Sequence, residues 1–158
     1  MYQTILLCYD GARESRAALE EGAEIAERLG AEAHLLAVNP PMTGEFVIEA
    51  VMSEAVLAER RRVAEAILRE GVDCLRQRRL TAEGHLAFGD PAAQIADCAR
   101  RIGADLVVVG HRPRSGLARW WEASVGQSLM DASPCSVLVA LGPKPAASAG
   151  GCLETGVS

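Results

Sequence analysis

The chain has 158 residues, of which 49% are hydrophobic and 4% aromatic, and its formal net charge is -5. This length fits one domain whose core is built from small aliphatic side chains. The negative charge argues against a general nucleic-acid or anionic-membrane surface, because either would need a basic face to neutralise phosphates.

The five cysteines are widely spaced and form no CxxC pair, so neither a metal site nor a disulfide framework is visible. We interpret them as small buried apolar residues of a protein in a reducing compartment. The amino-terminus has no basic region followed by an apolar signal core, and no apolar run reaches the roughly 18 residues of a membrane span. We therefore expect a cytoplasmic protein that binds no membrane and no nucleic acid.

Apolar runs alternate with amphipathic segments along the chain, a pattern typical of parallel strands covered by helices on both faces. The predicted strands are Thr4–Tyr9, Ala33–Val38, Thr81–Phe88, Leu106–Val109 and Ser136–Leu141. The predicted helices are Glu14–Leu29 followed by Gly30, Ser53–Arg78, and a third from Pro91 to about Ile102, with Asp90 as N-cap and Gly103 after it. Ser124 is predicted to open and cap a further helical segment.

Two segments depart from this alternation. Pro40, Pro41 and Gly44 interrupt it, so residues 39–52 are expected to form an excursion that is either a lid or a mere connection. Residues 143–158 are rich in Pro, Ala, Ser and Gly, which predicts a disordered tail after a domain of residues 1–142. The basic run of residues 60–62 is interpreted as a solvated helix face.

Ligands of open parallel sheets bind beyond the carboxyl ends of the strands, where the strand order reverses. The loop after the first strand, with Asp10 and Gly11, qualifies for such a site. The Asp10 carboxylate is placed to accept a ribose hydroxyl or to hold a metal near phosphates, and equally to cap the turn. The sequence leaves these two roles open.

A second loop follows Gly110, which ends an apolar strand. It contains His111, Arg112 and Arg114, and Ser124 lies at the start of the next helix. A glycine that allows a sharp turn, followed by a helix N-terminus with unpaired N–H groups, is an arrangement that holds phosphate. Alternatively, the two arginines are ordinary solvent-exposed charges of a loop. A lone histidine such as His111 is more often a hydrogen-bonded polar residue than a ligand contact.

Four ordered blocks resemble the universal stress protein family over roughly residues 2 to 141. They are residues 5–11, residues 89–91, residues 103–110, and Ser124-Val125 with residues 132–139. The resemblance implies a single-domain α/β fold: an open parallel five-stranded sheet in the order 3-2-1-4-5 with helices on both faces. It also implies a homodimer through the last strand, Ser136 to Leu141, and, in one branch of the family, ATP with magnesium at the carboxyl edge of the sheet.

The resemblance also implies positions for a nucleotide. The adenine and ribose end would be lined by Asp10, Gly11 and Val38. The phosphates would face Gly110, Arg112, Ser124 and Val125, with His111 and Arg114 in the same loop.

The ATP-binding branch has Gly, two residues, Gly, nine residues, and Gly followed by Ser or Thr. This chain keeps the spacing but has Pro113 and Ala123 in place of the second and third glycines. Proline supplies no N–H to a phosphate, and the alanine methyl hinders close backbone approach. Arg112 and Arg114 would compensate through charge-assisted bonds.

We therefore expect a small regulatory module of the stress response that binds ATP or another adenine nucleotide. The alternative is a dimeric interaction protein of the same family that binds no nucleotide. No nucleophile–base pair or carboxylate dyad is visible, so we expect no enzyme beyond slow incidental ATP hydrolysis. An adenylate-forming enzyme or flavoprotein is disfavoured, since residues 10–13 lack paired histidines and the chain is short.

Overall fold

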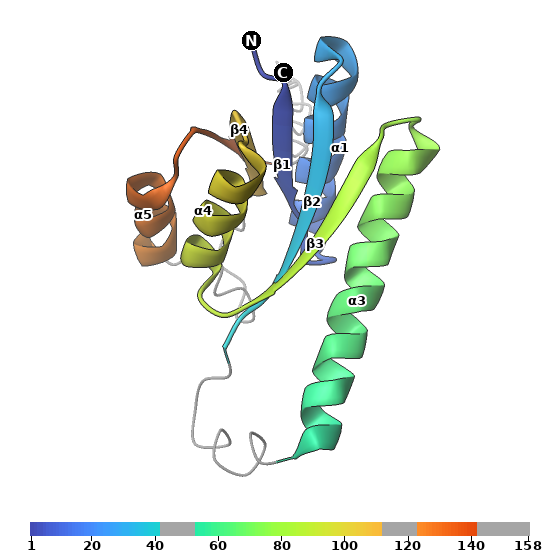
Figure 1. Cartoon of the computed structure of the whole chain (residues 1–158), viewed down its shortest axis with the longest axis vertical. Coiled ribbons are helices and arrows are strands. Elements are labelled where there is room, and N and C mark those ends of the chain that lie inside the picture. Colours follow the sequence, from blue (N-terminus) through green and yellow to red (C-terminus); the bar gives the residue numbers. More distant parts are fainter. Residues whose placement is uncertain (42–52, 112–122, 142–158) are drawn as a thin grey trace, which may run out of the picture.

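The computed structural model describes residues 1–41, 53–111 and 123–141, with the backbone alone for residues 123–125. Its strands are β1 (Thr4–Cys8), β2 (Glu32–Asn39), β3 (Ala82–Phe88), β4 (Leu106–Gly110) and β5 (Ser136–Ala140). Its helices are α1 (Arg13–Leu29), α3 (Glu54–Gln77), α4 (Pro91–Ile102) and α5 (Ala123–Ala132) (Figure 1). The strands form one parallel sheet in the order β3-β2-β1-β4-β5, as predicted.

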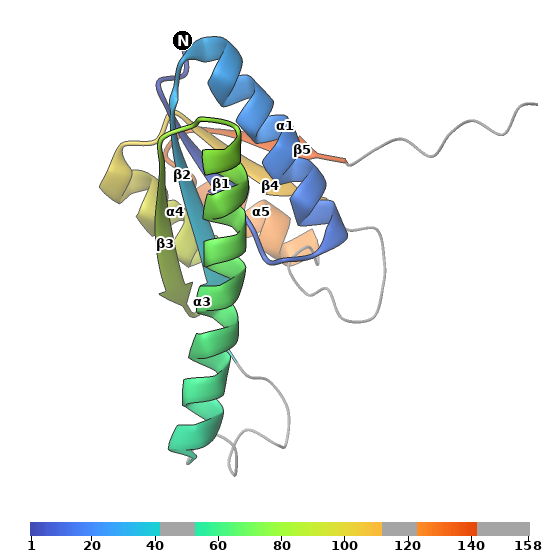
Figure 2. The same cartoon turned by 90° about the vertical axis from the view of Figure 1, so that its right-hand side faces the viewer.

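Helices cover both faces of the sheet. Figure 2 shows α1 and α3 in front of it and α4 and α5 behind it. Alternate residues of the strands supply the two cores: Leu7 and Leu35 belong to the core under α1 and α3, and Leu6 and Leu36 to the core under α4. All four are at most 1% exposed. Burial on both faces explains why these strands are continuous apolar runs in the sequence.

Helix α3 lies closely on the sheet at its carboxyl-terminal half and extends past the sheet at its other half. At Gly71, an added Cβ would lie 2.4 Å from Leu35 Cδ2 and 2.9 Å from Tyr9 Cδ1, so only glycine allows this approach. Figures 1 and 2 show the amino-terminal half of α3 continuing beyond the carboxyl ends of the strands. This overhang provides a wall for a site at that edge.

The predicted end signals of two helices are confirmed. Asp90 Oδ2 accepts a hydrogen bond from Ala93 N at 3.0 Å at the start of α4, where Pro91 is the first helical residue. Gly30 and Gly103 end α1 and α4 in the left-handed conformation, with φ of 64° and 66°. Helix α5 already begins at Ala123.

The first described residue of α5 is thus one position before Ser124, and the side chain of Ser124 is not described, so its capping role stays a prediction. A helix start placed from side-chain type alone is uncertain by one or two residues.

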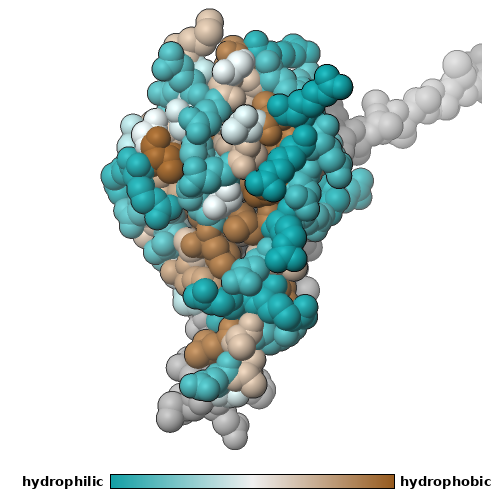
Figure 3. Space-filling model, turned by 45° about the vertical axis from the view of Figure 1, so that its right-hand side comes forward, coloured by the Kyte–Doolittle hydropathy of each residue, from teal (hydrophilic) through white to brown (hydrophobic). Residues whose placement is uncertain are grey.

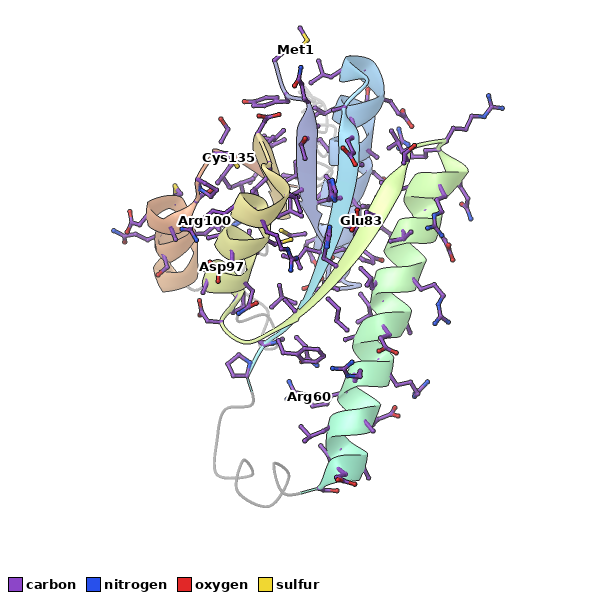
Figure 4. The ribbon with its side chains drawn as sticks, in the orientation of Figure 1. Met1, Arg60, Glu83, Asp97, Arg100 and Cys135 are labelled. Atoms are coloured by element: carbon purple, nitrogen blue, oxygen red, sulfur yellow. The ribbon has the colours of Figure 1, made fainter. Side chains whose placement is uncertain are left out.

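Polar contacts join elements far apart in the chain. Asp105 Oδ2 accepts from Gln3 N at 2.7 Å and from Thr4 N at 3.0 Å, which lowers the pKa of this carboxyl and ties the beginnings of β1 and β4 together. Arg100 on α4 donates from Nη2 to the Ala132 carbonyl oxygen at 2.8 Å (Figure 4). None of the described helices combines the length and apolarity needed to cross a bilayer.

Three predicted features fall outside the described residues: most of the excursion of residues 39–52, the tail of residues 143–158, and the middle of the loop after β4. The domain boundary near residue 142 therefore stays a prediction.

Candidate functional site

A cavity of about 310 Å³ opens at the carboxyl ends of β1 and β2, against the overhanging part of α3. Its volume lies in the range of small-molecule sites. The lining residues are Tyr9, Asp10, Ala37, Val38, Asn39, Pro40, Glu59, Arg60, Val63, Ala64 and Ile67. The strand order reverses between β1 and β4, so the cavity flanks the position where parallel sheets bind their ligands.

Asp10 organises the turn between β1 and α1. Its Oδ1 accepts from Ser15 Oγ at 2.5 Å and from Ala12 N at 3.0 Å. Gly11 has φ of 80°, a conformation that favours glycine, so the chain turns here without strain. The turn-capping interpretation of Asp10 is thus confirmed, and the same side chain also lines the cavity.

Tyr9 forms a fixed, neutral part of the wall. The residue is 2% exposed, and its hydroxyl donates to Glu70 Oε1 at 3.0 Å. Burial, together with the Glu70 acceptor, raises the pKa of Tyr9 to about 12. Glu70 is held in turn by an ion pair with Arg16 on α1. These contacts connect α1, β1 and α3 behind the cavity.

Arg60 joins the overhanging part of α3 to the end of β2. Its Nη2 donates to Asn39 Oδ1 and to the Pro40 carbonyl oxygen, both at 2.6 Å, and Figure 4 shows its position between the two elements. The interpretation of residues 60–62 as a simple solvated face is therefore wrong for Arg60. The signal was present in the sequence, because Arg60, Ala64 and Ile67 share one helix face at spacings of four and three.

The rest of the lining is mostly apolar. Val38 is 6% exposed and Ala64 is 7% exposed, whereas Val63 is 44% exposed. Figure 3 shows apolar side chains gathered over the seam between β3 and α3 and bordered by hydrophilic ones. The polar residues of the lining are Asp10, Asn39, Glu59 and Arg60, so the cavity offers a planar apolar ligand two carboxylates, one amide and one guanidinium beside aliphatic walls.

The second predicted half of the site begins at Gly110. A Cβ added there would lie 2.7 Å from the carbonyl oxygen of Glu14 and 3.0 Å from Ser15 Cα, so Gly110 is required by close packing against the first turn of α1. Gly110 is the last residue of β4 and is not among the glycines with positive φ, and the predicted turn after it falls outside the described residues. His111 N donates to the Ala140 carbonyl oxygen at 2.8 Å, which continues the pairing of β4 with β5.

The structure thus brings together Asp10, Gly11 and Val38, and places Gly110 against the residue that holds Asp10. Arg112 and Arg114 lie outside the described residues, as does Pro113. Ser124 and Val125 have a described backbone in the first turn of α5, and their side chains are not described.

The family model of the universal stress protein family matches residues 1–140, and the chain belongs to this family. A universal stress protein of Thermus aquaticus is 32% identical over 143 residues, covering 88% of this chain and 98% of the relative. Universal stress protein YxiE of Bacillus subtilis is 27% identical over 146 residues, covering 88% and 99%.

Solved structures show the same relationship. A universal stress protein in complex with cAMP superposes with a TM-score of 0.67 at 27% identity, covering 90% of this chain and 99% of that one. The universal stress protein of Archaeoglobus fulgidus in complex with dAMP superposes with a TM-score of 0.61 at 20% identity, covering 87% and 97%. The second likeness bears on the fold alone, and both agree with the parallel five-stranded architecture.

Proposed function

We propose that the chain is a regulatory module that binds an adenine nucleotide in the cavity at the carboxyl ends of β1 and β2. The observation that carries this proposal is the Asp10 carboxylate, held by Ser15 and the turn, in a cavity that also has aliphatic walls. The similarity to a universal stress protein solved with cAMP supports the same ligand class.

The lining matches the parts of a nucleoside. A base would lie against Val38, Ala64 and Ile67, which offer apolar surface on two elements. The ribose hydroxyls would donate to Asp10, whose orientation is fixed by Ser15 and the backbone of the turn. Because the protein carries a net charge of -5, the phosphate needs local cations.

Arg60 supplies one such cation at the cavity. Arg112 and Arg114, which follow β4 in the sequence and lie outside the described residues, would supply two more. Pro113 and Ala123 stand where the ATP-binding branch of the family has glycines, which removes one phosphate donor and hinders approach to another. We therefore propose that a nucleotide with one phosphate, such as AMP or cyclic AMP, binds more tightly than ATP with magnesium.

We also propose a homodimer through β5. This strand lies at an edge of the sheet, and Leu141 directly after it is 72% exposed. An uncovered edge of this kind is completed by a partner strand. In sedimentation equilibrium, Leu141→Lys should shift the protein toward monomer, whereas Leu29→Lys on α1 should not. A monomeric wild-type protein at micromolar concentration would contradict the proposal.

The module would act by changing its affinity for a protein partner, which needs no fast chemistry, and we place it in the cytoplasm. There thiols stay reduced, which suits the free and buried Cys8 and Cys98. Burial raises the pKa of both thiols, so neither has the low pKa of a reactive cysteine.

The test is nucleotide content followed by titration calorimetry. Freshly purified protein is denatured, the supernatant is chromatographed, and nucleotide-free protein is titrated with AMP, cyclic AMP and ATP with and without magnesium. Copurified nucleotide or a micromolar dissociation constant for a monophosphate supports the proposal. Absence of nucleotide and of heat with all three ligands would overturn it and favour the alternative of a dimeric interaction protein.

A further inference from the structure

Outside the cavity, polar side chains gather on the opposite face of the sheet, where β2 and β3 run side by side. His34 Nδ1 lies 3.0 Å from His85 Nε2. One ring nitrogen of each histidine and one carboxylate oxygen of Glu83 all lie within 4.8 Å of one another. Figure 4 shows Glu83 on β3 at this position. The two histidines are 51 residues apart in the chain, so no local sequence motif reveals the cluster.

The register of the two strands builds this arrangement. His34 pairs with Glu83, and Leu36 pairs with His85, so the histidines are diagonal neighbours across the parallel strands. Glu83 and His85 are two residues apart on β3 and therefore point to one face, the face covered by α4. Because both strands are part of the regular sheet, the three side chains start from a fixed backbone.

His34 is buried to 6% exposure, which a polar ring tolerates only with partners. Glu32, two residues earlier on the same face, places Oε1 3.4 Å from His34 Nε2. A carboxylate beside Nε2 favours the proton on that nitrogen and leaves the Nδ1 lone pair toward His85. An outer carboxylate that orients a histidine in this way is the usual surrounding of a metal-bound imidazole.

We propose that His34, His85 and Glu83 form a binding site for a divalent transition metal ion such as Zn²⁺. Two imidazoles and one carboxylate are a set of ligands that Zn²⁺ takes in three-ligand sites, with water in the fourth position. Nitrogen ligands at about 2.0–2.1 Å and tetrahedral angles are about 3.3 Å apart, and the observed separation is 3.0 Å. The rings lie nearly parallel, with an angle of 21° between their planes, so small side-chain rotations would turn both lone pairs to a shared ion.

The local charge also favours a cation. Glu32 and Glu83 contribute two negative charges, and Arg101 on α4 opposes them with one positive charge near His85. Arg101 is directed to Cys98, to whose Sγ its Nη2 donates at 3.5 Å. Hard ions such as Mg²⁺ and Ca²⁺ prefer all-oxygen surroundings, so the pair of imidazoles selects against them.

The site is separate from the nucleotide cavity. His34 precedes Val38 by four residues on β2, about 13 Å along the strand, and none of His34, Glu83 and His85 lines the cavity. Metal binding and nucleotide binding can therefore be measured, and can fail, independently.

The experiment is a titration of EDTA-treated, isotope-labelled protein with ZnCl₂, followed by NMR of the imidazole nitrogens. The chain has three histidines, so His111 is an internal control in the same molecule. We expect saturation at one ion per chain, with large shifts for His34 Nδ1 and His85 Nε2 and none for His111. Shifts that are absent at one equivalent of Zn²⁺, or that are equal for all three rings, would overturn the proposal.

Single substitutions that should leave the fold intact test the same metal site. His85→Gln lies on an edge strand and is only half-buried, so the fold should persist. We expect His85→Gln to weaken Zn²⁺ binding at least tenfold and Glu83→Gln to weaken it about tenfold. The control Glu54→Gln, at the far end of α3, should leave it unchanged. Binding that survives both site variants would show that the cysteines or other groups hold the ion, and would contradict this assignment.

Discussion

The two faces of strand β2 carry different chemistry and obtain it in different ways. On the side of α3, the cavity takes its polar groups from the turn after β1 and from an overhanging helix, through Asp10 and Arg60. On the side of α4, His34 and its neighbours on β3 are positioned by strand register. The first site therefore depends on where a turn and a helix meet the edge of the sheet, whereas the second depends on the pairing of two neighbouring strands.

The largest change in ligand affinity should come from a substitution that fills the cavity. Ala64→Leu adds three carbon atoms to a lining residue of α3 that is 7% exposed. We expect nucleotide affinity to fall at least tenfold, because the added side chain occupies the space of the base. Calorimetry on the variant should still show wild-type Zn²⁺ binding.

Ala66→Leu is the matched control, since it makes the same change on the exposed face of the same helix. It should bind nucleotide as the wild type does. Equal losses in both variants would mean that helix distortion, not cavity filling, causes the effect.

The second effect concerns the contact between α3 and β2. Arg60→Gln removes the charged donor to Asn39 and Pro40. Charge-assisted hydrogen bonds contribute about 1.5–3 kcal/mol each when buried, and partial exposure reduces this, so we expect the free energy of unfolding to fall by about 1 kcal/mol. Nucleotide affinity should fall severalfold. Urea unfolding and calorimetry measure both quantities, and unchanged nucleotide affinity would remove Arg60 from the proposed site.

A further prediction concerns metal binding on the face of the sheet that α4 covers. Glu32→Gln keeps the size of the side chain but removes the charge beside His34 Nε2. Loss of an outer partner of a metal ligand typically costs 10–100-fold in metal affinity. We expect the Zn²⁺ affinity to fall about tenfold, which is the lower end of that range, and nucleotide affinity to stay unchanged. A variant that binds Zn²⁺ as tightly as the wild type would show that Glu32 does not orient the ring.

The smallest effect on either site should come from Asp105, at the amino-terminal edge of the sheet. Hydrogen bonds from Gln3 N and Thr4 N hold its pKa below the ordinary value of 3.8. A carboxyl whose pKa is lower in the folded than in the unfolded protein stabilises the fold at pH values above its unfolded-state pKa. This stabilisation is lost as the pH falls through its folded-state pKa. Asp105→Asn should therefore be less stable than the wild type at pH 5–7, and the difference should shrink below pH 3.8.

Unfolding followed by circular dichroism across pH 2–7 measures this difference. Asp73→Asn, an exposed residue of α3, is the control and should show little pH-dependent loss. A difference for Asp105→Asn that grows as pH falls would contradict the predicted sign.

Much of the fold was predictable because both faces of the sheet are buried. Burial on both sides makes each strand a short apolar run, and helix ends are marked by Gly30, Asp90 and Gly103. The predicted ends are off by a residue at places such as Tyr9, which follows β1 instead of ending it. The strand order rested on the family resemblance, because no local pattern determines which strands become neighbours.

The candidate site was predictable only in part, because local sequence patterns do not determine which distant segments come together. Asp10 follows from a general rule about strand ends, whereas Val38 was implied by the family resemblance. Helical spacing places Arg60 on one face with Ala64 and Ile67, but its contacts with Asn39 and Pro40 also depend on how far α3 extends past the sheet. The cluster of His34, Glu83 and His85 depends on the register of β2 against β3, a long-range pairing that a single sequence does not specify.

The most direct test of the account uses one isotope-labelled sample and two ligands. Backbone and imidazole NMR spectra are recorded after adding AMP and again after adding ZnCl₂. We predict that AMP shifts the amides of Asp10, Val38 and Ala64 and leaves both imidazoles of the metal cluster in place, and that Zn²⁺ then shifts His34 and His85 alone. No AMP-induced shifts around the cavity would contradict the central claim that this edge of the sheet binds an adenine nucleotide.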